Sequence, residues 1–176
     1  MSHLQRSEHH ERLTRWVRDH GSAVRGYLGA MVRKSDVADD LLQEVFRRAW
    51  QARERYQEAG TPKAYLLKIA DRLVYDRSRK SGREVNFESE TWEQIQPTGR
   101  DGDPSDNLNN EETQRQLAAA LDTLSPPQRR ALLLRYYGDM SFAEIAKAMD
   151  CPLNTALSHC HRGLAALKKQ FVADLE

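Results

Sequence analysis

The sequence predicts an all-α protein made of two small helical domains joined by a flexible acidic linker. Apolar residues recur every three or four positions in residues 1–83 and again in residues 113–176, which is the spacing of one helix face. Between these blocks, the chain is rich in Gly, Pro, Ser, Asp and Asn and shows no sustained apolar period. Roughly thirty such residues are too many for a loop inside a compact domain. We therefore place the linker at residues 84–112.

Charge is segregated along the chain, although the net charge is only +1. Residues 1–83 hold 18 Lys or Arg against 11 Asp or Glu, residues 84–112 hold one against nine, and residues 113–176 hold eight against six. A basic block, an acidic linker and a mildly basic block indicate different surroundings for each part. The near-neutral average therefore does not exclude a nucleic-acid partner.

Several protein classes are excluded by composition. No apolar run approaches the ~20 residues that span a bilayer, and the polar N-terminus lacks the apolar core of a secretory signal. The two cysteines, Cys151 and Cys160, do not form a disulfide framework. We expect a cytoplasmic protein without membrane insertion.

The first predicted helix has apolar residues from Trp16 to Val32, and its three glycines are expected to loosen it. In the next helix, Ser35 is expected to be the N-cap, and Asp36 lies in the first turn, where the helix dipole favours anions. Its predicted buried stripe consists of Val37, Leu41, Val45, Phe46 and Ala49. Its outward polar face consists of Asp40, Gln43, Glu44 and Arg47.

A third helix is predicted to begin at Thr61 and Pro62, because proline suits the first helical position. Its apolar face consists of Leu66, Ile69 and Leu73, with Tyr65 beside them. Its basic side consists of Lys68, Arg72, Arg79 and Arg83, with Arg77, Lys80 and the ring of Tyr75 nearby. A basic stripe with aromatic rings suits a nucleic-acid backbone and unpaired bases. A charged helix face that contacts only solvent would show the same sequence pattern.

Residues 141–168 predict a helix-turn-helix. Ser141 and Glu144 have capping-box spacing, and Pro152 is expected to end the first helix because it has no backbone N–H. The second helix is expected to begin at Asn154 or Thr155. The apolar face of the first helix consists of Phe142, Ile145, Ala146 and Met149, and that of the second consists of Ala156, Cys160, Leu164 and Leu167. This motif can present a helix to the DNA major groove, although it also occurs as plain scaffold.

In order and spacing, these patterns resemble the bacterial RNA polymerase sigma factors of the extracytoplasmic-function (ECF) group. The resemblance runs from about Trp16 to Leu167 and omits the linker. The family's helix that docks on the largest polymerase subunit is matched by SDVADDLLQEVFRRAW, residues 35–50. Its helix that melts and reads the −10 element is matched by AYLLKIADRLVYDRSRK, residues 64–80. Its −35-reading domain is matched from Leu121 onward by LDTLSPPQRRALLLRYYGDMSFAEIA and the helix-turn-helix.

The resemblance implies three groups of site residues. Core polymerase would be bound by Asp39, Asp40, Leu42, Gln43, Glu44, Phe46 and Arg47. The −10 element would be bound by Tyr65, Lys68, Arg72, Tyr75, Arg77, Arg79 and Lys80. The −35 element would be bound by Asn154, Thr155, Leu157, Ser158, His159, His161 and Arg162.

The chain departs from the family pattern at readout positions. Tyr65 stands where the family commonly has Trp, and Asp71 and Arg72 stand where it has Arg-Asn. Leu157 replaces a basic residue and His159 replaces an arginine. Because leucine cannot bind guanine bidentately, we expect an unusual −35 preference.

The expected partners are core RNA polymerase, through its largest and second-largest subunits, promoter DNA, and an anti-sigma or other regulatory protein. We expect no cofactor, metal or catalytic activity. His159, Cys160 and His161 point about 100° apart in turn on one helix, so they do not converge on a metal ion. No nucleophile is paired with a base.

Two alternatives remain at this level. A stand-alone helix-turn-helix regulator would bind duplex DNA without polymerase, but it would have no use for the helix at residues 35–50. A degenerate sigma factor would bind its protein partners without opening promoters.

Overall fold

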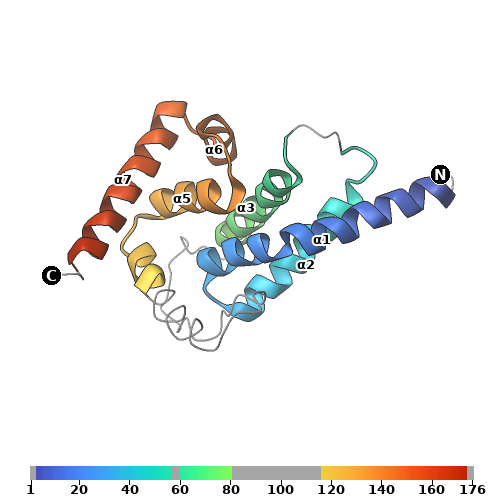
Figure 1. The fold of residues 1–176 in the computed structure, drawn as a ribbon, viewed down its shortest axis with the longest axis horizontal. Coiled ribbons are helices and arrows are strands. Elements are labelled where there is room, and N and C mark those ends of the chain that lie inside the picture. The colour runs from blue at the N-terminus through green and yellow to red at the C-terminus, as the bar shows by residue number, and fades with distance from the viewer. Residues whose placement is uncertain (1–2, 57–59, 81–115, 174–176) are drawn as a thin grey trace. The chain divides into compact units, whose positions relative to one another are not determined.

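The computed structural model describes residues 3–56, 60–80 and 116–173, and all regular structure within them is helical (Figure 1). This confirms the all-α prediction. A further helical stretch is present at residues 116–122. The named helices are α1 (His3–Val32), α2 (Ser35–Gln51), α3 (Pro62–Lys80), α5 (Pro126–Gly138), α6 (Phe142–Met149) and α7 (Leu153–Ala173).

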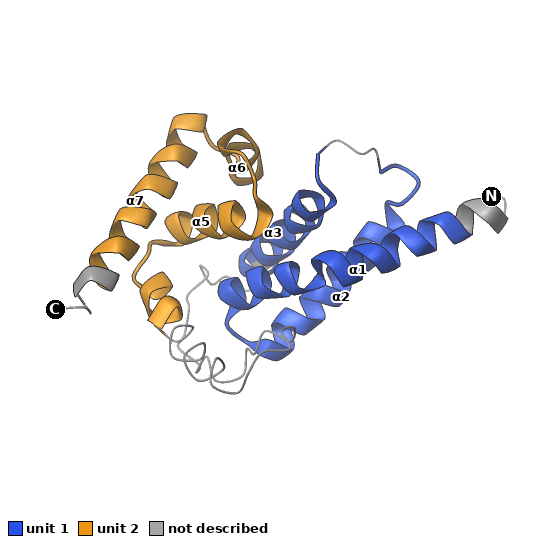
Figure 2. Cartoon of the chain, in the orientation of Figure 1, with its two compact units in different colours: residues 1–86 blue, residues 87–176 orange. Residues whose placement is uncertain are grey.

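The chain forms two compact units, Met1–Asn86 and Phe87–Glu176 (Figure 2). The first contains α1, α2 and α3, and the second contains α5, α6 and α7. The predicted linker at residues 84–112 lies outside the described residues, and its boundaries stay a prediction. No helix in the described parts of the chain is long and apolar enough to cross a membrane.

The core of unit 1 is built on the C-terminal half of α1, which packs against both α2 and α3. Val24, Tyr27 and Leu28 are fully buried there. The predicted loosening of this helix is wrong, because α1 continues unbroken through Gly21, Gly26 and Gly29. Packing against two neighbouring helices offsets the low helix propensity of glycine.

The predicted N-cap of α2 is also wrong. Lys34 is the N-cap, with an extended backbone at φ −121° and ψ 117°. Its carbonyl accepts the first helical hydrogen bond from the Ala38 N–H at 2.9 Å. Ser35 is therefore already helical, and its hydroxyl accepts a hydrogen bond from Arg25 Nη2 at 3.3 Å instead.

The buried stripe of α2 confirms Leu41, Val45 and Ala49 and adds Ala38. Val37 and Phe46, which were also expected to be buried, are only half-buried. Both lie at the edges of the buried stripe, where the side chains are only partly covered by the neighbouring helices. α2 is thus held by a narrow row of small and branched side chains.

The start of α3 confirms the Thr61–Pro62 prediction, since Thr61 Oγ1 accepts a hydrogen bond from the Ala64 N–H at 3.2 Å. The apolar face is wider than predicted, because α3 contacts α1 and α2 together. Ile69 and Tyr65 are only half-buried. The buried apolar residues of α3 are Ala64, Leu66, Leu67, Ala70, Leu73 and Val74.

A polar contact connects α1 and α3 inside this core. Asp71 is only 1% exposed, and the Tyr27 hydroxyl donates a hydrogen bond to its Oδ1 at 2.7 Å. A buried carboxylate must have donors, because leaving it without them costs free energy. The contact therefore fixes the rotation of α3 about its own axis.

Unit 2 is anchored by two buried arginines at the start of α5. Arg129 Nε donates to the Leu121 carbonyl at 2.8 Å, and Arg129 Nη2 lies 3.3 Å from Asp122. Arg130 Nη2 donates to the Ala148 carbonyl at 2.8 Å. These bonds tie the helical stretch at 116–122 and the end of α6 to α5.

The predicted capping box of α6 is confirmed. The Glu144 N–H donates to Ser141 Oγ at 3.3 Å, and the Ser141 N–H donates to Glu144 Oε2 at 3.0 Å. The break after α6 is where it was expected, but its cause differs. α6 ends because Asp150 adopts a left-handed conformation with φ 51°, and Cys151 N–H donates to the Ala146 carbonyl at 3.0 Å.

Pro152 opens α7 rather than closing α6. Its carbonyl accepts hydrogen bonds from the N–H groups of Thr155 and Ala156, at 3.0 and 3.1 Å. α7 therefore begins at Leu153, one or two residues before the start predicted at Asn154 or Thr155.

The inner face of α7 is made of small side chains. Ala156, Cys160 and Gly163 are buried, whereas Leu164, predicted to be in the stripe, is 61% exposed. A Cβ on Gly163 would lie 2.8 Å from Leu132 Cδ1 on α5. At Gly163, therefore, α5 and α7 approach too closely for a larger side chain, whereas Leu167 on the same face is half-buried.

The buried tyrosine–aspartate contact leads to a prediction about stability. Tyr27→Phe removes one hydroxyl donor from a buried carboxylate, so we expect a loss of about 1–3 kcal/mol in the free energy of unfolding. Urea denaturation followed by tryptophan fluorescence measures it, since Trp16 and Trp50 lie in this unit. The matched control is Asp76→Asn, an exposed carboxyl on α3 that should change stability by less than about 0.5 kcal/mol. Equal stability of Tyr27→Phe and the parent chain would contradict the structural role of the contact.

Candidate functional sites

The outward side of α2 carries the residues that sequence analysis assigned to polymerase binding. We call Asp39, Asp40, Leu42, Gln43, Glu44, Phe46 and Arg47 the α2 surface. At about 100° per residue, Asp40, Gln43 and Arg47 lie opposite the buried row, and all three are exposed. Leu42 and Phe46 lie on one flank and are half-buried. The surface is therefore polar at its centre and apolar along one edge.

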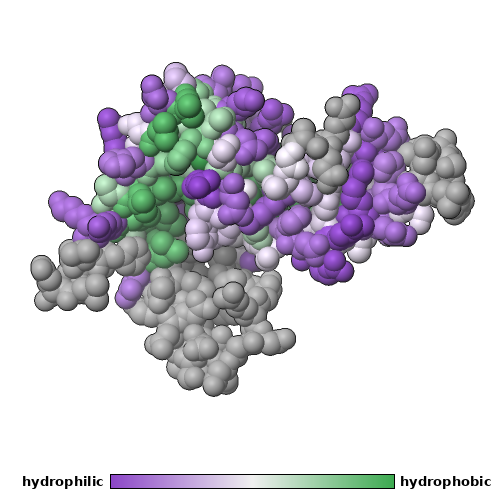
Figure 3. All heavy atoms as spheres, turned by 45° about the horizontal axis from the view of Figure 1, so that its top comes forward, coloured by the Kyte–Doolittle hydropathy of each residue, from purple (hydrophilic) through white to green (hydrophobic). Residues whose placement is uncertain are grey.

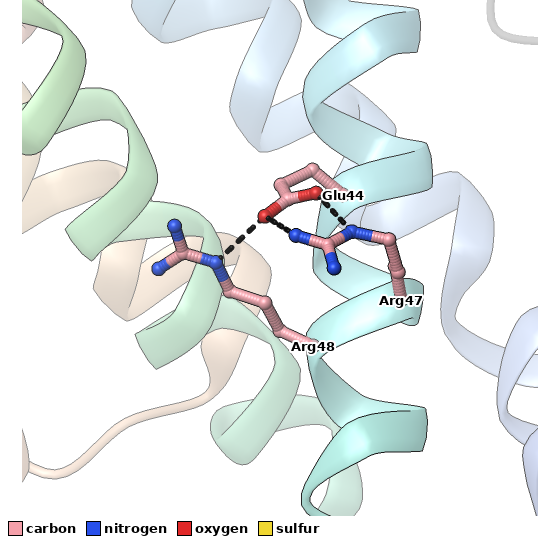
Figure 4. Close-up of polar contacts among 3 residues, drawn as sticks. All are labelled: Glu44, Arg47 and Arg48. Atoms are coloured by element: carbon pink, nitrogen blue, oxygen red, sulfur yellow. Dashed lines mark hydrogen bonds and ion pairs between the residues drawn. The ribbon is translucent and has the colours of Figure 1, made fainter.

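Glu44 is held by two arginines of its own helix (Figure 4). Its Oε2 accepts from Arg47 Nε at 2.6 Å, and its Oε1 accepts from Arg48 Nε at 2.9 Å. The hydrogen bonds from Arg47 and then Arg48 lower the pKa of Glu44 to about 2. On this surface Glu44 thus serves as part of a charged cluster, ionised at any physiological pH.

Asp39 has a partner on a neighbouring helix. Arg25 Nε of α1 donates to Asp39 Oδ1 at 2.8 Å, and the Asp39 side chain is 47% exposed. Part of its charge is therefore neutralised within unit 1. Asp40 stands between Asp39 and the Glu44 cluster as an exposed carboxylate.

The outward side of α3 forms a basic and aromatic row. Lys68, Arg72, Tyr75 and Arg79 follow one another at steps of four, three and four, which keeps them within about 60° on the helix. We call these four residues the α3 stripe. Arg72, Tyr75 and Arg79 are exposed, with Tyr75 at 44%, and Lys68 is half-buried.

Two predicted DNA-binding residues lie apart from this stripe. Arg77 is exposed, but it lies about 140–180° around the α3 axis from the stripe residues. Lys80 ends α3, and its side chain lies outside the described part of the chain. The structure therefore separates Arg77 from the other arginines of α3.

Tyr65 belongs to an aromatic cluster instead of standing free. Its ring lies 4.7 Å from that of Tyr56 and 5.9 Å from that of Trp16, and the latter two are 4.8 Å apart. The Arg12 guanidinium lies over both Trp16 and Tyr56, at 5.4 and 5.3 Å. Burial raises the pKa of the Tyr65 hydroxyl. This cluster holds the N-terminal end of α3.

Sequence analysis missed two members of this cluster, Arg12 and Tyr56. Arg12 lies in the first half of α1, which begins at His3, before the apolar residues from Trp16 to Val32 that were named from the sequence. Arg12 Nη2 also donates to the Arg53 carbonyl at 2.9 Å. The apolar spacing of Leu13, Trp16 and Val17 was the available signal for the longer helix.

α7 exposes the predicted −35 residues unevenly. Asn154, Leu157, His161 and Arg162 are exposed, Thr155, Ser158 and His159 are half-buried, and Cys160 is buried. Burial raises the pKa of the Cys160 thiol, so the thiol stays protonated and apolar. In the described residues, no group of three or more His, Cys, Asp or Glu side chains could hold a metal ion.

The comparisons with known proteins agree with this arrangement. The Sigma-70 region 2 family matches residues 16–84, and the Sigma-70 region 4 family matches residues 114–167. The RNA polymerase sigma factor CarQ of Myxococcus xanthus is 30% identical over 157 residues, covering 89% of this chain and 87% of CarQ. The ECF sigma factor SigX of Bacillus subtilis is 28% identical over 145 residues, covering 81% and 75%.

A longer relative is the ECF sigma factor SigE of Mycolicibacterium smegmatis, 30% identical over 152 residues. The matched part covers 86% of this chain but only 58% of SigE. From these matches, the chain belongs to the ECF sigma factors of RNA polymerase.

Solved structures show the same fold. The sigma factor RpoE of Bartonella quintana, crystallised with the anti-sigma factor NepR, matches with a TM-score of 0.72 at 24% identity, over 93% of this chain and 99% of its own. CnrH, in complex with the cytosolic domain of CnrY, matches with a TM-score of 0.66 at 18% identity, over 97% of both chains. At these identities the matches establish the fold.

The Glu44 cluster gives a prediction about pH. Because its pKa lies near 2 rather than 4.5, the stabilisation from this cluster is complete above pH 4.5 and is lost as the pH falls toward 2. NMR titration of the Glu44 carboxyl should show its midpoint near 2. Arg47→Ala with Arg48→Ala should raise the midpoint toward 4.5. A midpoint that does not move in this double variant would show that other groups lower it.

Proposed function

We propose that this ECF sigma factor binds core RNA polymerase through the α2 surface and brings it to promoters that the α3 stripe and α7 recognise. The observation that supports this best is the arrangement of exposed side chains. One unit combines a polar docking surface with a basic, aromatic stripe, and the other presents a helix-turn-helix. A stand-alone DNA regulator would not need the polar docking surface.

Polymerase binding is supported by the chemistry of the α2 surface. Asp40 and Gln43 are exposed at its centre, and Leu42 and Phe46 offer apolar contact at its edge. By family resemblance, the partner is the pair of clamp helices of the largest polymerase subunit. The second-largest subunit would contact the other unit. Two linked contacts raise the effective concentration, so each can be weak.

Promoter opening is proposed to use the α3 stripe. Lys68, Arg72 and Arg79 would contact phosphates of the displaced strand, and the exposed ring of Tyr75 can stack on an unpaired base. Tyr65 is committed to the aromatic cluster, so we assign it to positioning α3. Asp71 is buried and is assigned no contact with DNA.

The −35 element is proposed to meet the outward side of α7, which follows a three-residue turn after α6. Residues near the start of such a helix reach the base edges in the major groove. Asn154 and Thr155 would lie near phosphate at the helix N-terminus. Leu157, Ser158, His161 and Arg162 would face the bases.

A protein inhibitor is a further proposed partner. RpoE of Bartonella quintana is bound to an anti-sigma factor, and CnrH is bound to the cytosolic domain of CnrY. We infer that this chain is likewise held by a regulatory protein until a signal releases it. Catalysis would belong to the polymerase, and the chain would act in the cytoplasm.

The experiment that tests the proposed function is a pull-down with core RNA polymerase followed by run-off transcription on pooled promoters. Binding with discrete transcripts supports a working sigma factor. Binding without transcripts indicates the degenerate alternative, and no binding overturns the proposal.

Asp40→Lys tests the α2 surface. Reversing an exposed charge at its centre should weaken polymerase binding at least tenfold, or about 1.4 kcal/mol, without affecting the fold. Fluorescence anisotropy of the labelled chain measures it. Asp19→Lys makes the same charge change on an exposed part of α1 and should leave the affinity as it was. Equal losses in both variants would indicate a general charge effect.

Arg72→Ala tests the α3 stripe against Arg77→Ala, its matched control on the opposite side of the same helix. If Arg72 neutralises a phosphate of single-stranded DNA, its removal should reduce the slope of log affinity against log salt by about 0.7. Holoenzyme binding to a pre-melted promoter measures this slope. Arg77→Ala should keep the parental slope, and the reverse order of effects would move the DNA path to the other side of α3.

A further inference from the structure

We propose that Leu157 reads the methyl group of a thymine in the −35 element, so that α7 selects a T·A base pair there. This inference rests on the proposed function of α7 and adds the base that the helix selects.

The first nine residues of α7 cannot make the commonest contact to guanine. Residues 153–161 read LNTALSHCH and contain neither Lys nor Arg. Guanine is recognised best by a bidentate Arg or Lys at O6 and N7. Arg162, the first cation of the helix, lies in its third turn. The turns that reach deepest into a major groove therefore offer hydroxyl, amide, imidazole and apolar groups.

Leu157 lies among the polar residues of this outer side. Leu157 is 37% exposed. Because an α-helix turns by about 100° per residue, Leu157 lies about 60° from Asn154 and about 40° from His161 around the helix axis. Leu153, one turn earlier, is 48% exposed. The space-filling view shows hydrophobic residues gathered on the visible face of unit 2 (Figure 3).

Leu157 lies outside the buried row of α7. The buried inner face of α7 uses Ala156, Cys160 and Gly163, and at Gly163 the side chain of Leu132 on α5 lies too close for a larger residue. More than a third of the Leu157 surface is exposed instead. Its methyl groups are available to a ligand that approaches the polar side of the helix.

Thymine is the matching base, because its C5-methyl is the apolar group that base pairs display in the major groove. Burying one methyl group contributes about fourfold in affinity. The same leucine placed against the amino group of cytosine or adenine would desolvate a donor without giving it an acceptor. Leu157 therefore favours thymine and disfavours the alternatives.

The test uses the full-length chain bound to core RNA polymerase. A −35 element is first selected from a randomised promoter library, and each thymine in it is then replaced by deoxyuridine, which removes only the methyl group. At one position, we expect the parent holoenzyme to lose about fourfold in affinity. Leu157→Ala should bind the two DNAs equally.

Leu164→Ala is the matched control, since Leu164 is more exposed than Leu157 and lies two turns further from the helix N-terminus. It should keep the parental preference for thymine. Leu157→Gln, which retains length but loses apolar surface, should behave like Leu157→Ala.

Three results would overturn the inference, and they can be told apart. A selected −35 element without thymine, or an unchanged thymine preference in Leu157→Ala, would refute the role of Leu157 while leaving α7 as the −35 reader. A holoenzyme that transcribes with no dependence on the −35 sequence would overturn the proposed function of α7, and the inference with it.

Discussion

The two candidate surfaces of unit 1 depend on one constraint, the burial of α2 and α3 against the C-terminal half of α1. Val24, Tyr27 and Leu28 form the centre of that contact. Since a helix turns by about 100° per residue, burying one side presents the opposite side to solvent. The α2 surface and the α3 stripe are those opposite sides. The hydrogen bond from Tyr27 to Asp71 then sets the rotation of α3, and with it the direction of the stripe.

Unit 2 also buries one side of each helix, but its packing leaves the outer side of α7 exposed. Its helices approach closely through small side chains, and the buried Arg129 and Arg130 donate hydrogen bonds to the backbone carbonyls of Leu121 and Ala148. These arginines are structural in spite of their charge. The scaffold holds α7 by its inner face and places few limits on its outer face. Substitutions on the outer face of α7 are therefore expected to preserve the fold.

Local signals were the reliable ones in the sequence. The Ser141–Glu144 capping box and the Thr61–Pro62 start were predicted correctly because each involves residues three or four positions apart. The predicted cap at Ser35 and the burial of Leu164 were wrong. The first depends on the extended backbone at Lys34, and the second on how closely α5 approaches α7. Neither the backbone conformation of Lys34 nor the distance between α5 and α7 can be predicted from the spacing of nearby residues in the sequence.

The helical class of the chain, the order of its helices, its segregated charge and its resemblance to ECF sigma factors could all be predicted from the amino-acid sequence. These properties follow from short-range periodicity and motif order. Tertiary structure decided which candidate residues are available to partners. It buried Asp71 and enclosed Tyr65 in a cluster with Arg12 and Tyr56. The physical reason is that availability depends on contacts between residues far apart in the chain, and helical spacing alone does not specify which helices meet.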